Sequence, residues 1–151
     1  MIEQEFCLSK EEFSLVQAKL KAAVEFGFIS EDDPDAIVWR CQDHNRSIED
    51  RLNKGEVIYG MTCFSLPAYL QYELTRFRLD FVEGKAKNYA YKPITDEDKR
   101  GFYQENQELF KRCLGDYFAY EDAESVIEKR IREEEYYSYV QNILCQCKSG
   151  K

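Results

Sequence analysis

The sequence predicts an all-α protein, organised as a single orthogonal bundle of about five helices over residues 1–151. Three observations support this fold class. Only 7 glycines and 3 prolines occur in 151 residues, which disfavours an architecture rich in β-turns. Apolar residues recur at spacings of three and four along several segments. Capping residues stand where most of these segments begin, and the length suffices for one domain with its own core.

The first two predicted helices both have clear start signals. Ser9 and Glu12 have the spacing of a capping box, in which each side chain bonds the backbone amide of the other residue. We therefore predict a helix over residues 10–26. The next helix begins at Asp33 and Pro34, because aspartate caps helix N-termini and proline suits the first turn.

Three further helices complete the prediction. One lies between Ser65, which can cap it, and Gly84. Another spans about 96–108 and begins with acidic residues, which favour the positive end of a helix. The last spans about 121–144, packs with the N-terminal helices and is followed by a tail expected to fray. The residues expected in the core are Phe13, Val16, Leu20, Ile37, Ile48, Leu70, Leu74, Phe77, Val126, Ile127, Ile131 and Val140.

Charge and hydropathy argue against several classes of partner. The net charge of −8 disfavours nucleic acids and anionic membranes, both of which are bound through lysine and arginine. No apolar run approaches the roughly 20 residues that a membrane span requires, so no membrane insertion is expected. The acidic start lacks the pattern of a signal peptide, which predicts a cytoplasmic protein as the chain stands, or an extracytoplasmic one if a leader has been removed.

The cysteines and the single histidine allow three interpretations. Cys41 and His44 lie one turn apart, and Cys145 and Cys147 could complete a four-ligand zinc site or form a redox pair. Cys41 and His44 could also act as a nucleophile and its base. The simplest interpretation is a cysteine and a histidine on a helix face together with a loose tail, because structural zinc sites favour C-x2-C spacing. We therefore predict no metal, no cofactor and no catalytic residue.

Three stretches of the sequence carry a resemblance to a known family. Residues 45–72 contain a helix with an asparagine, then Gly-Glu-Val-Ile-Tyr-Gly and a tyrosine-bearing helix. Residues 95–110 read as a threonine, acids and then Tyr-x-x-Asn and Phe, and residues 120–144 form a long charged helix with an apolar stripe. Together they resemble the helical chaperone module of SurA/PrsA-type foldases, in which a parvulin prolyl-isomerase domain separates the last two stretches.

The resemblance implies a foldase without its isomerase domain. A parvulin domain needs about 90 residues, well inside the usual range of domain sizes, whereas residues 111–119 are the whole connector here. The expected function is therefore non-enzymatic: a chaperone-like module that binds unfolded or extended polypeptide. The alternative is a dedicated accessory factor that binds one protein or precursor peptide in a maturation or secretion system. The wide apolar surface also allows a homodimer, and the candidate contact residues are Trp39, Tyr69, Tyr72, Phe118 and Tyr137.

Overall fold

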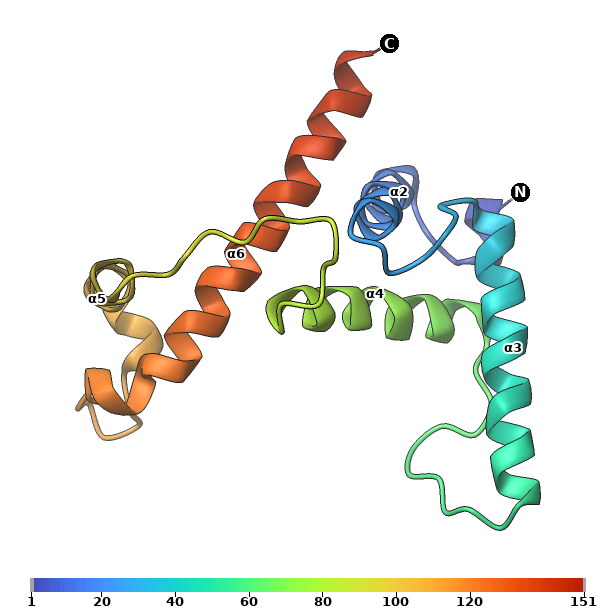
Figure 1. The fold of residues 1–151 in the computed structure, drawn as a ribbon, viewed down its shortest axis with the longest axis horizontal. Helices are drawn as coiled ribbons and strands as arrows, with labels where there is room; N and C mark the ends of the chain where they lie inside the picture. Colours follow the sequence, from blue (N-terminus) through green and yellow to red (C-terminus); the bar gives the residue numbers. More distant parts are fainter. Residues whose placement is uncertain (1, 151) are drawn as a thin grey trace.

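The computed structural model describes residues 2–150 and confirms the all-α prediction, with five long helices in this part of the chain. The elements are α1 (Ile2–Glu5), α2 (Lys10–Glu25), α3 (Pro34–Asn53), α4 (Leu66–Val82), α5 (Asp96–Glu105), the 3₁₀ turn η1 (Gln107–Phe110) and α6 (Tyr120–Ser149). As predicted, the long C-terminal helix packs against N-terminal helices, namely α2 and α4 (Figure 1). None of the helices within residues 2–150 has the length and apolar character that crossing a bilayer demands.

The helix starts agree with the predicted caps. The Ser9 amide donates to the Glu12 carboxylate at 2.8 Å, and the Glu12 amide donates to the Ser9 hydroxyl at 3.2 Å. Ser65 caps α4 through the Ala68 amide in the same manner. Such caps are contacts between residues two or three apart, so they can be predicted without knowing the tertiary structure.

Two helix ends differ from the prediction. The last helix continues through the expected frayed tail to Ser149, whose hydroxyl donates to the Cys145 carbonyl at 3.0 Å. The fourth helix ends earlier, at Glu105, because the Asn106 side chain bonds the Phe102 carbonyl and the chain tightens into a 3₁₀ turn.

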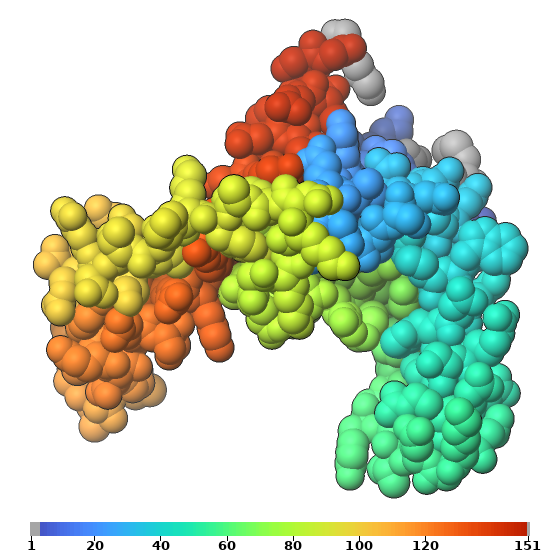
Figure 2. Space-filling model, viewed as in Figure 1, coloured from blue at the N-terminus to red at the C-terminus, as the bar shows by residue number. Residues whose placement is uncertain are grey.

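The helices divide the molecule into two regions. In Figure 1, α4 lies across the molecule, α3 passes one of its ends and continues below it, and α6 passes the other end. The first half of α6 carries α5 and η1, and we call residues 96–131 the distal lobe. Figure 2 shows a hollow on the lower side of the molecule, between the distal lobe and the lower end of α3.

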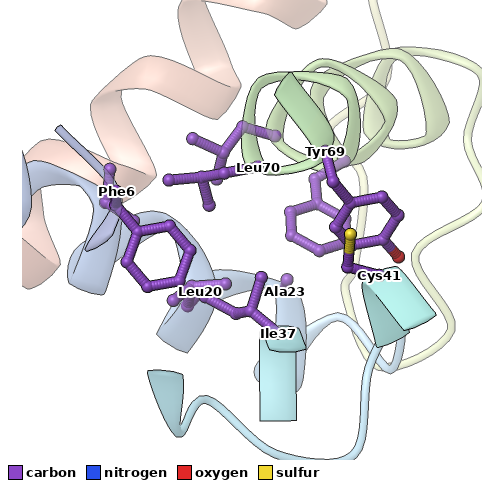
Figure 3. Close-up of a cluster of buried hydrophobic side chains, with 10 residues drawn as sticks. Phe6, Leu20, Ala23, Ile37, Cys41, Tyr69 and Leu70 are labelled. Carbon is purple, nitrogen blue, oxygen red and sulfur yellow. The ribbon is translucent and has the colours of Figure 1, made fainter. Parts of the chain in front are cut away.

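Three clusters of buried side chains form the core. The first joins α2, α3 and α4 and contains Phe6, Leu20, Ala23, Ile37, Cys41, Tyr69 and Leu70 (Figure 3). The second joins α2, α4 and the second half of α6 around the ring of Phe26. The third lies inside the distal lobe, where Phe102 and Phe110 pack against Ile127.

The predicted core is confirmed at most positions, and one position is wrong. Phe13 and Ile131 are only partly buried, while Val126 is 49% exposed. Val126 and Ile127 are neighbours on α6 and point about 100° apart around the helix axis. Because Ile127 occupies the third cluster, Val126 faces outward.

Candidate interaction surface

The connector between η1 and α6 is an ordered turn. The Phe118 amide donates to the Phe110 carbonyl at 2.8 Å, and the Tyr103 hydroxyl donates to the Phe118 carbonyl at 2.6 Å. Gly115 has a φ of +89°, a backbone conformation that favours glycine. These bonds hold the turn against α5 and η1, so its side chains project from a fixed base.

The projecting side chains are mostly apolar. Leu114 is 97% exposed, and the other large exposed apolar side chains of the distal lobe are about half exposed. We call this set the distal apolar surface, and it consists of Leu109, Leu114, Tyr117, Phe118 and Val126. Leu109, Phe118 and Val126 also line a small groove of about 230 Å³. Exposed apolar side chains that gather along one groove, as these three do, mark sites of interaction.

Charged side chains border the distal apolar surface. The Arg112 guanidinium lies over the Phe118 ring, 5.1 Å from its centroid, and is paired with Asp116 at 3.4 Å. Asp122 and Arg130 line the small groove beside the apolar residues. An apolar centre with a mixed-charge rim is the usual composition of a protein–protein interface.

A second feature is a buried ion pair between α3 and α4. The Glu73 side chain is buried and accepts hydrogen bonds from Arg40 Nε at 2.5 Å and Arg40 Nη2 at 3.0 Å. The Tyr69 hydroxyl donates to the same carboxylate at 3.3 Å. Burial, and then the negative charge of Glu73, raise the pKa of Tyr69. These groups satisfy one another, so they serve to join the two helices.

A third feature is a groove of about 480 Å³ between α6 and residues 89–98. Its Glu135 carboxylate accepts hydrogen bonds from Tyr89 at 2.7 Å and from Arg132 at 2.6 Å. Burial alone would raise the pKa of Glu135, but the two hydrogen bonds, the charge of Arg132 and the Lys92 backbone together lower it below its ordinary value. Glu135 therefore stays ionised and anchors the linker to α6.

The five predicted contact residues do not form one site. Trp39 is 68% exposed on α3, Phe118 belongs to the distal apolar surface, and Tyr137 is partly exposed on α6, where its hydroxyl accepts a hydrogen bond from Arg78. Tyr69 is buried in the first cluster, and Tyr72 is partly covered by packing against His44 and Phe64.

Four members of the distal apolar surface were not predicted from the sequence: Leu109, Leu114, Tyr117 and Val126. Two of them, Leu114 and Tyr117, could have been predicted. They are apolar residues inside a nine-residue connector, where polar residues are usual.

Cys41 and His44 have packing roles in the structure. Burial raises the pKa of the Cys41 thiol, and burial followed by the charge of Arg76 lowers the pKa of His44. His44 packs against the aromatic rings of Phe64 and Tyr72. Within residues 2–150, no three histidine, cysteine, aspartate or glutamate side chains gather closely enough to hold a metal ion.

Comparison with known proteins identifies one similar fold. No protein-family model matches the chain, and no curated protein matches it significantly. Among solved structures, the native GH136 lacto-N-biosidase from Eubacterium ramulus matches 87% of this chain with a TM-score of 0.71 and 23% sequence identity. Its selenomethionine derivative matches 88% with a TM-score of 0.67 and 24% identity. This chain spans only 27% of the length of that protein, and the similarity establishes a shared fold.

The comparison corrects the foldase interpretation. The similar structure is a glycoside hydrolase, so the resemblance to a SurA/PrsA-type chaperone module was wrong, and with it the chaperone-like function and its accessory-factor alternative. The matching stretches were helix caps, a loop and a long amphipathic helix, which unrelated helical proteins share. The prediction that the chain is not an enzyme depended on the missing isomerase domain, so it falls with that resemblance.

Proposed function

We propose that this chain is the helical component of a glycoside hydrolase, which packs against the catalytic part of the enzyme through the distal apolar surface. The observation that carries the proposal is the fold match, in which 87% of this chain corresponds to a minor part of a lacto-N-biosidase. The remaining length of that enzyme lies outside the similarity. A helical component of this kind would support catalysis by stabilising the folded structure of the catalytic part.

The carboxyl groups of the chain support this division of roles. Cleavage of a glycosidic bond uses two carboxyl groups about 5 to 9.5 Å apart, and the one that donates a proton has a raised pKa. Glu135 in the groove beside α6 has a lowered pKa, and the Glu73 carboxylate is paired with Arg40. We therefore propose that the catalytic carboxyl pair lies in the part of the glycoside hydrolase that corresponds to the unmatched length of the lacto-N-biosidase.

The distal apolar surface has the properties that such packing requires. Its turn is held by backbone hydrogen bonds, so little conformational entropy is lost when a partner binds. Leu114 is almost fully exposed and Phe118 is about half exposed, and burial of their remaining apolar area would stabilise a complex by about 25 cal/mol per Å². The mixed charges at the rim would then set the orientation.

Capture of the tagged chain from the cells that naturally produce it tests this proposal. The eluate is assayed with a chromogenic lacto-N-bioside and with a panel of other chromogenic glycosides. We expect glycosidase activity to elute with the wild-type chain, and Phe118→Asp to lower the captured activity by about tenfold or more, because a charge on this surface would be desolvated.

Val57→Asp is the matched control, because Val57 is 71% exposed on the loop after α3, away from the distal lobe. It introduces the same charge and should leave the captured activity within about twofold. Circular dichroism verifies that both variants stay folded. A wild-type eluate without activity on any glycoside would refute the proposed function, and equal losses for both variants would refute the assigned surface.

A further inference from the structure

We infer that the outer face of α3 binds a neutral oligosaccharide, with Trp39 as the stacking surface and Gln42, Glu49 and Thr62 as hydrogen-bonding groups. The choice of a saccharide among polar ligands rests on the proposed function. The site itself is assigned from its own geometry, and it is separate from the distal apolar surface.

A groove of about 540 Å³ runs between α3 and the segment that leads into α4. Its lining residues are Gln42, Asn45, Arg46, Glu49, Leu52, Thr62 and Cys63. The Asn45 side chain fixes the far wall, because its Oδ1 accepts from the Phe64 amide at 2.7 Å and its Nδ2 donates to the Phe64 carbonyl at 2.9 Å. The groove is therefore held open before any ligand arrives, which favours binding.

Three polar side chains of this groove have unused hydrogen-bonding capacity. Gln42, Glu49 and Thr62 make no side-chain hydrogen bond to another residue of the described chain, unlike Glu73 and Glu135. Together they offer an amide, a carboxylate and a hydroxyl, which can both donate to and accept from sugar hydroxyl groups.

The charges of the groove favour a neutral ligand. Arg46 and Glu49 bring opposite charges to it, and Arg46 is additionally paired with Asp43 at 3.3 Å. A ligand with a strong charge of either sign would meet a group of like charge here, which costs binding energy.

Trp39 lies on the same face of α3 as three residues that line the groove. Trp39, Gln42, Arg46 and Glu49 follow one another at spacings of three and four, so they share one face of α3. The indole ring is 68% exposed and offers a flat apolar surface. Sugar rings have apolar C–H faces and polar edges, so they match an aromatic ring next to polar side chains.

The length of the site indicates an oligosaccharide. Trp39 and Glu49 are ten residues apart, which is about 15 Å along a helix with a rise of 1.5 Å per residue. A single sugar ring cannot reach both, whereas a chain of three or four sugars can.

An exposed tryptophan can also anchor a protein partner. Here its neighbours on the same face are Gln42, Asp43 and Arg46, all exposed and polar, and the exposed Leu52 of the groove lies more than three turns further along α3. No apolar centre of the kind that a protein interface needs therefore surrounds the indole. The polar surroundings favour a saccharide.

Fluorescence gives a direct test, because Trp39 is the only tryptophan of the chain. The purified chain is titrated with cellotetraose, maltotetraose, chitotetraose and laminaritetraose, and with glucose and N-acetylglucosamine. We expect at least one tetrasaccharide to cause a saturable blue shift, with an affinity about tenfold or more above that of its monosaccharide. A response to none of the tetrasaccharides would overturn the inference.

Calorimetry with variants locates the site. Trp39→Ala and the double variant Gln42→Ala/Glu49→Ala should each weaken binding of the best tetrasaccharide by about tenfold or more, and both should fold normally because these side chains are exposed. Gln104→Ala, an exposed change on α5, should bind like the wild type. Unchanged binding by Trp39→Ala would overturn the inference.

The two proposals can fail independently. Saccharide binding is measured on the purified chain alone, whereas the proposed function is measured as captured glycosidase activity. If Trp39→Ala abolished that capture while the wild-type chain bound no tetrasaccharide, the face of α3 would be a protein contact and the saccharide assignment would be wrong.

Discussion

Replacing Phe26 with alanine is expected to lower the free energy of unfolding by roughly 3 to 5 kcal/mol. Phe26 is 1% exposed and lies at the junction of α2, α4, the linker after α4 and α6. Its ring centroid is 4.7 Å from that of Tyr139, 4.9 Å from that of Phe81 and 5.5 Å from that of Tyr89. Because these rings belong to different elements, they cannot close the cavity without moving a helix or the linker.

Urea denaturation followed by circular dichroism measures this effect. Phe118→Ala is the matched control, because it removes the same ring from a site that is 47% exposed and should cost less than about 1 kcal/mol. A loss below about 1 kcal/mol for Phe26→Ala would mean that α6 does not pack on α2 and α4 through this cluster.

Replacing Glu73 with alanine is expected to cost about 3 kcal/mol. The change leaves the partly buried Arg40 guanidinium without its partner and removes the acceptor of the Tyr69 hydroxyl. Leaving one charge of a buried pair uncompensated is the main source of the loss. Removing both charges is different, because apolar side chains of similar volume can replace a buried ion pair at little cost.

Replacing both charged side chains together separates these contributions. Arg40→Met/Glu73→Leu should recover most of the stability that Glu73→Ala loses, as measured by urea denaturation. Arg51→Met/Glu56→Leu is the control, because that ion pair is half exposed and should change the stability by less than about 1 kcal/mol. If Glu73→Ala and the double replacement lowered the free energy of unfolding equally, the uncompensated charge of Arg40 would not be the main source of the loss.

Local chemistry explains which parts of the fold could be predicted from the sequence. The caps at Ser9, Ser65 and Thr95 are contacts with residues three positions away, and all three start helices in the structure. The end of α5 depends on the Asn106 side chain competing for a helix carbonyl, which a periodic apolar pattern does not reveal.

The candidate surface was harder to predict because exposure is a tertiary property. Val126 and Ile127 are both apolar and adjacent, and only the position of α5 decides which of them is buried. Of the predicted contact residues, Trp39 is exposed, whereas Tyr69 is a core residue hydrogen-bonded to Glu73. The foldase resemblance failed for a related reason, since capping signals and apolar stripes describe individual helices and not their arrangement.

Amide hydrogen exchange on the chain alone and in the captured complex tests the central claim most directly. If the chain is the helical component of a glycoside hydrolase, the complex contains a glycosidase, and amides of residues 111–119 exchange about tenfold more slowly than in the free chain. The loop over residues 56–61 should exchange at the same rate in both. A complex without a glycosidase, or slower exchange confined to segments outside the distal lobe, would contradict the account.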